Sequence, residues 1–174
     1  ISGILFWLFL YEMKKELFFK STIKGILAEE EIAEFLNQYF DDRKLKDKAL
    51  LTGNSAGTIP KNKTGDIVCE INGTPDIKIS IECKFDKSIR LGDIESKDIF
   101  TKKTETAWSQ LIEAQANRDS KVSLIIFDIS LVENSILKSF ENVGYIPGIG
   151  FVAIINSQKG DYSNLAIAYM LARD

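Results

Sequence analysis

Two strand-like segments joined by a tight turn are the feature that most constrains the fold of this chain. Residues 65–71 and 76–85 flank the turn residues 72–75 (Asn-Gly-Thr-Pro), and Asn-Gly is a typical hairpin dipeptide. In the second segment, apolar residues alternate with polar ones: Ile77, Ile79, Ile81 and Cys83 against Asp76, Lys78, Ser80, Glu82 and Lys84. A period of two directs one face of a strand toward a core and the other toward a polar site. The sequence therefore predicts an antiparallel hairpin with one apolar and one polar face.

The other segments predict helices packed on a mixed sheet. Helical patterns are expected at residues 21–40, 104–118 and 131–143, and further strands at 122–129, 150–155 and 165–171. Residues 49–52 form a short apolar stretch. Residues 53–64 have the composition of a loop. A length of 174 residues suits one domain. We expect an α/β (α+β) fold in which residues 21–174 form a single domain, with a mixed central sheet flanked by helices, and residues 1–20 form an apolar extension.

The composition excludes several kinds of active site. The chain contains no histidine, which rules out Ser-His-Asp and Cys-His catalysis, HExxH zinc sites and a histidine general base. The two cysteines, Cys69 and Cys83, are too few for a thiolate zinc site, and we expect them to be packed and reduced in a cytoplasmic protein. A net charge of −3 speaks against a generally basic surface but permits a local basic groove. A hydrolase with this composition must use carboxylates, lysine and hydroxyls, with or without a hard metal ion.

The amino-terminal segment is unusually apolar. Residues 1–11 (ISGILFWLFLY) precede Lys14 and Lys15, and they provide about half of the roughly 20 apolar residues that a membrane span needs. A secretory signal is not indicated, because its positive charge would precede the apolar run and a small-residue cleavage site would follow it. Three interpretations stay open: an extension from a vector or an upstream reading frame, the end of a truncated membrane anchor, or an interface helix. We expect a membrane as a partner only in the second case.

The polar face of the hairpin contains the strongest candidate for a catalytic site. With the turn near residues 73–74, antiparallel pairing places Asp66 opposite residue 81 or 82, and opposed side chains have Cβ atoms about 5 Å apart. Asp66 and Glu82 can therefore share a divalent cation, with Lys84 on the same face of its strand. Asp76 is excluded as the partner of Glu82, because six residues along one strand span about 20 Å. The alternative is that these charges form a solvated, salt-bridged surface.

Glu29, in the first predicted helix, is a third candidate ligand. At about 100° per residue, the apolar stripe of that helix is formed by Ile26, Ile32, Ala33, Leu36 and Phe40. Glu29 lies in the middle of this stripe, whereas Glu30 and Glu31 point away from it and are expected in solvent. An unpaired carboxylate on a buried face is costly, so we expect Glu29 to reach the same cation.

These residues resemble the core signature of the PD-(D/E)XK nuclease superfamily. Gly65-Asp66 followed by Ile81-Glu82-Cys83-Lys84 is similar to the superfamily motif, with glycine in place of the proline before the aspartate. Lys24-Gly25 with Glu29, together with the loop Gly53-Asn54-Ser55-Ala56-Gly57, is most similar to archaeal-type Holliday-junction resolvases. The resemblance covers about residues 21–130. It implies a restriction-endonuclease-like core in αβββαβ order, to which this chain adds a C-terminal helix and strands.

The resemblance also implies a Mg²⁺-dependent endodeoxyribonuclease, in which Mn²⁺ can substitute for Mg²⁺. Asp66, Glu82, Glu29 and the backbone carbonyl of Cys83 would hold the ion, since hard cations prefer oxygen ligands. Lys84 would orient or help deprotonate the attacking water and stabilise charge on the phosphate. By the same resemblance, Ser55 would contact phosphate and Gln110 on the second helix would line the site.

The resolvase likeness further implies branched DNA as the substrate, structure-selective cleavage and a homodimer, since paired symmetric cuts need two sites. Local basic clusters, among them Lys61 and Lys63, flank the site in sequence, as a groove that follows the phosphate backbone requires. Two alternatives stay open. One is a restriction- or repair-type nuclease that cuts linear DNA, and the other is a non-catalytic nucleic-acid-binding domain of the same fold.

Overall fold

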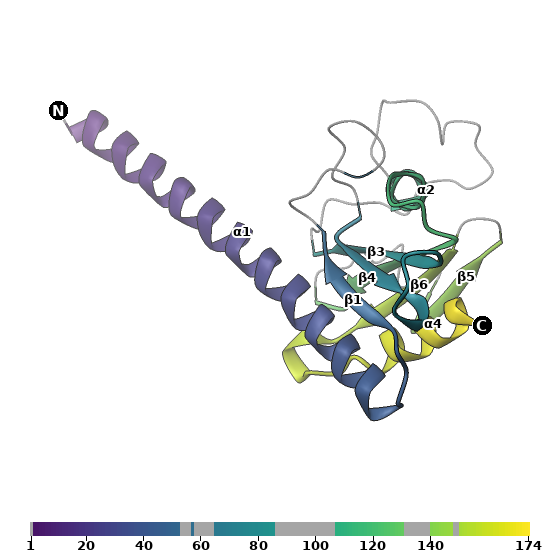
Figure 1. The fold of residues 1–174 in the computed structure, drawn as a ribbon. Helices are drawn as coiled ribbons and strands as arrows, with labels where there is room; N and C mark the ends of the chain where they lie inside the picture. Colours follow the sequence, from purple (N-terminus) through teal and green to yellow (C-terminus); the bar gives the residue numbers. More distant parts are fainter. Residues whose placement is uncertain (1, 53–56, 58–64, 86–106, 131–139, 148–149) are drawn as a thin grey trace.

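The structure, a computed structural model, describes the chain apart from residues 1, 53–56, 58–64, 86–106, 131–139 and 148–149 (Figure 1). For residues 2, 16–27 and 107–110 only the backbone is described. The described helices and strands are, in chain order, α1 (Ser2–Asp42), β1 (Lys48–Leu51), β2 (Ile67–Glu70), β3 (Lys78–Lys84), α2 (Ala107–Asn117), β4 (Val122–Asp128), β5 (Val143–Ile146), β6 (Gly150–Ile155) and α4 (Ser163–Arg173). Short 3₁₀ turns occupy Ile71–Gly73 and Ser157–Lys159.

The described strands form one mixed sheet of six strands in the order β1-β2-β3-β4-β6-β5. Strands β1, β2 and β3 are antiparallel neighbours, β4 lies parallel to both β3 and β6, and β5 is antiparallel to β6. The predicted hairpin is therefore present as the pair β2–β3. The predicted α/β fold, a mixed central sheet flanked by helices, is confirmed.

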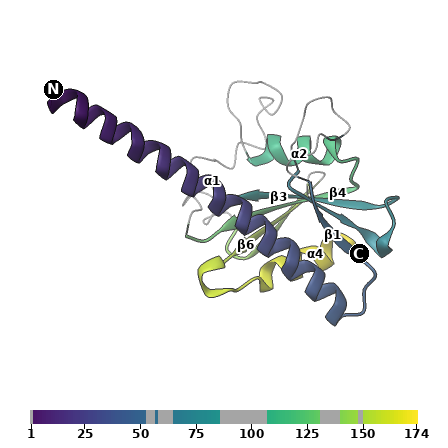
Figure 2. The same cartoon turned by 60° about the vertical axis from the view of Figure 1, so that its left-hand side comes forward.

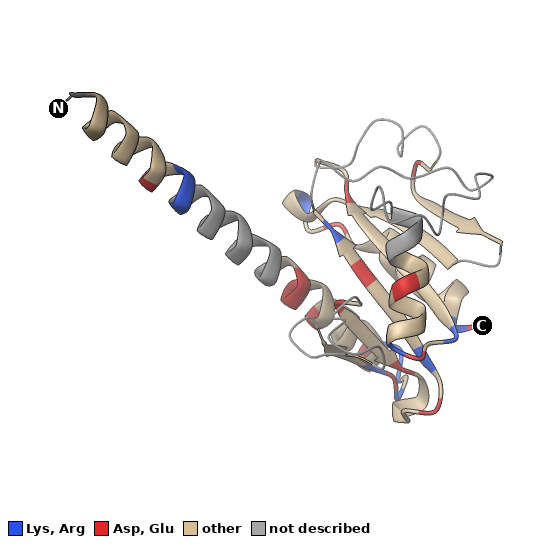
Figure 3. Cartoon of the chain, turned by 90° about the horizontal axis from the view of Figure 1, so that it is seen from above, with Lys and Arg blue, Asp and Glu red and all other residues tan. Residues whose placement is uncertain are grey.

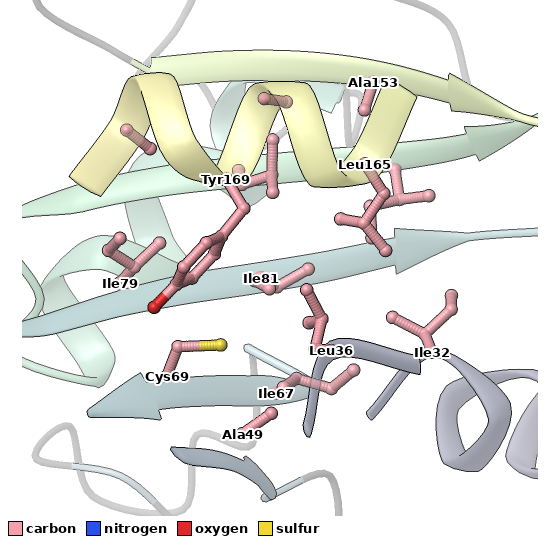
Figure 4. Packing of buried hydrophobic residues seen from close by; sticks show 14 of the residues in the cluster. Ile32, Leu36, Ala49, Ile67, Cys69, Ile79, Ile81, Ala153, Leu165 and Tyr169 are labelled. Atoms are coloured by element: carbon pink, nitrogen blue, oxygen red, sulfur yellow. The ribbon is translucent and has the colours of Figure 1, made fainter. Parts of the chain in front are cut away.

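Helices cover both faces of the sheet (Figure 2). The C-terminal part of α1 and all of α4 lie against one face, and α2 lies against the other. The larger core lies between the sheet and the pair α1 and α4, where Leu36, Ile67, Ile81, Leu165 and Tyr169 pack together (Figure 4). The apolar residues of β3 belong to this core, as the alternation predicted: Ile79, Ile81 and Cys83. Ile77, the first apolar residue of the predicted alternation, precedes β3 and is 47% exposed.

The first helix is longer than predicted. We expected a helix at residues 21–40, whereas α1 runs without a break from Ser2 to Asp42. The segment contains no proline and is rich in leucine, glutamate and lysine, so nothing in its sequence stops a helix. Its first turns project away from the sheet (Figure 1). Among the described residues, no helix combines the length and the apolar character needed to cross a bilayer.

Two predictions near the C-terminus are wrong. Residues 165–171, predicted as a strand, belong to helix α4. Its buried residues Leu165, Ala168, Tyr169 and Ala172 are spaced by three and four, which is the helical period. Val143, predicted as the end of a helix at 131–143, begins strand β5 and pairs with Ala153 of β6. The sequence Val-Gly-Tyr-Ile of β5 contains β-branched and aromatic residues that favour a strand; residues 131–139 lie outside the described part.

Candidate functional site

The antiparallel pairing of β2 with β3 brings Asp66 and Glu82 opposite each other. Ile67 pairs with Ile81. One residue further along, Asp66 therefore faces Glu82. The backbone of Asp66 is held from both sides, because its N–H donates to the carbonyl of Ile81 (3.0 Å) and its carbonyl accepts from the N–H of Thr52 (2.8 Å). The predicted register of the hairpin is confirmed.

Each strand holds the carboxylate of the other through a backbone N–H. The N–H of Cys83 donates to Asp66 Oδ2 (2.7 Å), and the N–H of Gly65 donates to Glu82 Oε2 (2.8 Å). Lys84 completes the group through an ion pair between its Nζ and Glu82 Oε1 (2.5 Å). The side chains of Lys84 and Glu82 are only 15% and 5% exposed. These charges are therefore largely buried and do not form the solvated surface that was the alternative.

Gly65 is required at its position by the backbone and by its neighbours. Its φ of +93° lies in a region that glycine adopts without strain and other residues rarely enter. A Cβ atom at this position would lie 2.8 Å from Cγ of Arg118. Gly65 also donates its N–H to Glu82, and proline has no such donor. The glycine that stands where the motif has proline thus positions Glu82 directly.

Arg118 is a residue of this site that the sequence did not indicate. It is buried at the end of α2, with Nε donating to the carbonyl of Gly65 (3.2 Å) and Nη2 donating to the carbonyl of Thr52 (3.0 Å). Burial lowers the pKa of Arg118, and the charges of Asp66 and Glu82 oppose this shift. Arg118 thus fixes the backbone next to Asp66 and adds a second cation near the carboxylates. Gly65 is 53 residues away in sequence, so no local pattern predicts the contact.

Glu29 approaches the carboxylates from α1. The apolar stripe predicted for this helix is present in the described side chains, since the following are buried: Ile32, Ala33, Leu36 and Phe40. Glu29 itself is half-buried. Burial, and then the charges of Asp66 and Glu82, raise the pKa of Glu29 to about 7. The helix therefore brings Glu29 within electrostatic range of both hairpin carboxylates, while Glu30 and Glu31 are exposed as predicted.

The site carries an excess of negative charge in a buried place. Burial raises the pKa of Asp66 and of Glu82, and the charge of Asp66 raises the pKa of Glu82 further. The ammonium of Lys84 acts in the opposite direction on both of these groups and on Glu29. Three carboxyl groups therefore face two cations, Lys84 and Arg118, in surroundings that penalise unbalanced charge.

The chemistry of these donors fits a hard divalent cation. Carboxylate oxygens are the ligands that Mg²⁺ and Mn²⁺ prefer, and a divalent ion would offset the repulsion that helps to raise the pKa values of Glu29 and Glu82. Within the described part of the chain, no three acidic or thiol side chains are arranged as a metal-binding group. The ligand set of Asp66, Glu82, Glu29 and the Cys83 carbonyl therefore stays a prediction.

Next to Glu82, the same face of β3 carries a cluster of buried hydroxyls. Ser80 Oγ lies 3.1 Å from Ser123 Oγ on β4 and accepts a hydrogen bond from Ser120 Oγ (2.8 Å). All three serines are buried, and α2 lies over this face of the sheet (Figure 2). The polar face of the hairpin is therefore structural along part of its length, and its charged residues Glu82 and Lys84 lie at the end of β3.

Most of the residues predicted to contact the substrate lie outside the part of the chain that the structure describes. Ser55, Lys61 and Lys63 are outside the described residues. Gln110 lies on α2, but only its backbone is described. Contacts of these four residues with phosphate or DNA stay predictions.

The thiol side chains of the cysteines have no role in this chemistry beyond packing. Cys69 and Cys83 are free and buried, as predicted. Burial raises the pKa of both thiols, and for Cys83 the carboxylates of Asp66, Glu29 and Glu82 raise it further. Both side chains are therefore protonated thiols at neutral pH and poor ligands or nucleophiles.

Asp66, Glu82 and Lys84 form a compact group at one end of the β2–β3 pair. Two acids and one ammonium, largely shielded from water, suit a reaction that needs a bound cation and a fixed positive charge. A comparison of the chain with family models, curated proteins and solved structures found no match in any of the three.

Proposed function

We propose that this chain is a metal-dependent DNA endonuclease of the PD-(D/E)XK type, which hydrolyses phosphodiester bonds at the end of the β2–β3 pair. The observation that carries the proposal is the buried group in which Asp66 faces Glu82 across the two strands and Lys84 pairs with Glu82. This is the arrangement that the sequence motif was expected to form. Its partners Gly65 and Arg118 hold it in place through backbone hydrogen bonds.

The order of the elements supports the proposal. The described elements α1, β1, β2, β3, α2 and β4 follow one another in the αβββαβ order expected of a restriction-endonuclease-like core. Strands β2 and β3 are antiparallel, and β3 and β4 are parallel. This topology collects site residues from distant segments: Asp66 and Glu82 come from the hairpin, Glu29 from α1, and Arg118 from the end of α2.

The charges of the site suggest which residues would bind the metal ion and which would stabilise the phosphate. Asp66, Glu82, Glu29 and the carbonyl of Cys83 would hold the cation. When bound, Mg²⁺ or Mn²⁺ supplies Lewis-acid polarisation of the phosphate and lowers the pKa of a water molecule. Lys84, whose Nζ is fixed 2.5 Å from Glu82 Oε1, would stabilise the negative charge that grows on the phosphate during attack.

The excess of carboxylates over cations at the site leads to a prediction about DNA binding. A DNA phosphate is negatively charged, so three carboxylates next to it would repel it unless a cation offsets their charge. We therefore expect DNA to bind at this site only with a divalent ion present. Branched DNA is the substrate class that we propose, and the active form would be a homodimer, because two symmetric cuts need two copies of one site.

The substrate is tested by incubating the chain with four-way junction, flap, linear duplex and single-stranded DNA, each with Mg²⁺, Mn²⁺ or EDTA. Paired symmetric nicks confined to the junction would support a resolvase-like enzyme. Equal cutting of linear duplex would instead favour a restriction- or repair-type nuclease. DNA binding that needs no metal and leads to no cleavage would favour a binding domain and contradict the proposal.

The site itself is tested by Asp66→Asn. We expect cleavage to fall by at least about 100-fold, the effect typical of removing one group that stabilises the transition state, with little change in the circular dichroism spectrum. The matched control is Asp76→Asn, because Asp76 is an exposed carboxylate near the start of β3, outside the site. A rate for Asp66→Asn equal to that of Asp76→Asn and of the wild type would remove the site assignment.

A further inference from the structure

The first turns of α1 expose a dense set of apolar side chains. Of the fifteen large apolar side chains that are exposed on the described part of the chain, eight lie within residues 4–13. Ile4, Trp7 and Phe9 are 68%, 70% and 61% exposed, and this part of the helix projects away from the sheet (Figure 1). Soluble proteins rarely expose a contiguous apolar surface of this kind without a partner for it.

The apolar residues surround the helix axis and do not form a stripe. At about 100° per residue, the consecutive apolar residues 4–11 leave no sector wider than about 60° without an apolar side chain. A second protein helix packed here would bury one face and leave the other side chains in water. A helix that is apolar on every side suits an environment that encloses it, and the hydrocarbon layer of a lipid bilayer is such an environment.

The residues that follow fit the headgroup layer of a bilayer. Residues 3–11 are uncharged (Figure 3), and the next residues along the helix include Glu12, Lys14 and Lys15, all exposed. With Glu16, which follows directly in the sequence, the charges at this level sum to zero. Lysine side chains next to a bilayer extend toward the headgroups. Tyr11, one turn before Lys15, is of a residue type enriched at the membrane interface.

We propose that residues 3–11 insert into the hydrocarbon of a lipid bilayer, with Tyr11, Lys14 and Lys15 at the level of the headgroups. Nine helical residues extend about 13 Å along the helix axis. Because α1 continues unbroken into the turns that pack on the sheet, the inserted segment would hold the domain beside the membrane. This partner does not depend on the nuclease activity proposed above.

The proposal is tested by flotation of the full chain with vesicles of phosphatidylcholine, alone or mixed with phosphatidylglycerol. We expect the chain to float with both, because the apolar segment and not the lipid charge drives insertion. The double substitution Leu5→Asp and Leu8→Asp should weaken binding at least about tenfold, because aspartate is costly in hydrocarbon. The matched control is Ile167→Asp with Leu171→Asp on α4, where the side chains are 52% and 54% exposed; this variant should float like the wild type.

The depth of insertion is measured by fluorescence. The chain has two tryptophans, so Trp108→Phe leaves Trp7 as the only one. Lipids brominated on their acyl chains should quench Trp7 emission. Emission that these lipids leave unchanged, or flotation that survives Leu5→Asp with Leu8→Asp, would overturn the proposal. Absence of flotation together with a lipid-independent dimer that this double substitution abolishes would also overturn it and assign the segment to a second copy of the chain.

Discussion

Gly65 combines three demands at one position: a φ of +93°, close contact with Arg118 and an N–H that donates to Glu82. Gly65→Ala keeps the N–H but strains the backbone and places a Cβ 2.8 Å from Cγ of Arg118. We expect the free energy of unfolding, measured by urea denaturation, to fall by more than about 1 kcal/mol. Cleavage should fall as well, because a shift of this backbone displaces the carboxylate of Glu82.

The control for this substitution is Gly160→Ala. Gly160 also has a positive φ, of +63°, but a Cβ there would have no neighbour within 4 Å. Gly160→Ala should therefore show backbone strain alone and unchanged cleavage. Equal losses of stability at the two positions, with full activity in both variants, would mean that the contact between residue 65 and Arg118 does not position the site.

At the scale of single residues, the sequence predicted what local spacing determines. The opposition of Asp66 and Glu82 follows from the turn position alone, and Glu29 follows from its place on a helical stripe. Arg118 could not be predicted, because its contact with Gly65 depends on how α2 docks on the sheet after a separation of 53 residues. The burial of Ser80 had the same cause, since alternation shows that a face is polar but does not show what covers it.

At the scale of elements, α1 consists of two parts with different roles, and leucine to alanine substitutions separate them. Leu36 is fully buried in the core, so we expect Leu36→Ala to lower the free energy of unfolding by about 2–5 kcal/mol. Leu8 is 55% exposed on the projecting turns, so Leu8→Ala should stay within about 0.5 kcal/mol of the wild type. Urea denaturation in the absence of lipid measures both. A large loss for Leu8→Ala would show that the first turns pack against the domain.

The elements that the sequence misassigned share a physical reason. A short apolar run such as residues 165–171 is compatible with both a buried strand and a buried helix. Here the packing of Leu165 and Tyr169 on the sheet selects the helix. Strand β5 is stabilised by pairing with β6, a contact that its four residues do not reveal. By contrast, β3 was predicted well because its apolar and polar residues alternate clearly. Strand β4 was predicted well because its apolar run is long and has clear borders.

At the scale of the whole molecule, one buried carboxylate joins distant segments. Asp47, just before β1, accepts hydrogen bonds from the N–H of Asn72 (2.9 Å), the hydroxyl of Tyr169 (2.7 Å) and Nε of Arg173 (2.7 Å). Tyr169 and Arg173 belong to α4 and lie 122 and 126 residues away in sequence. The Asp47 side chain is fully buried, so its charge depends on these donors. The network thereby fastens the C-terminal helix to the start of the sheet.

The pKa of Asp47 is shifted in a definite direction, downward. Burial acts to raise its pKa, but the hydrogen bonds from Arg173, Tyr169 and Asn72 outweigh burial and hold the pKa of Asp47 below its ordinary value. A carboxyl group whose pKa is lower in the folded than in the unfolded chain stabilises the fold above the unfolded value of about 3.9. That contribution is lost as the pH falls through the folded pKa.

We therefore expect Asp47→Asn to lower the free energy of unfolding most at neutral pH. It leaves the guanidinium of Arg173 without its carboxylate, and losses of about 3–5 kcal/mol are typical when one partner of a buried pair is removed; because Arg173 is 19% exposed, the lower end of this range applies. The difference from the wild type should shrink as the pH falls below about 3.9, the unfolded value, toward the lower pKa of the folded chain, because the wild-type carboxylate then loses its own contribution. Urea denaturation across this range measures it, with the exposed Asp76→Asn as control. A difference that stays constant with pH would mean that the shape of this side chain, and not its charge, fastens α4 to the sheet.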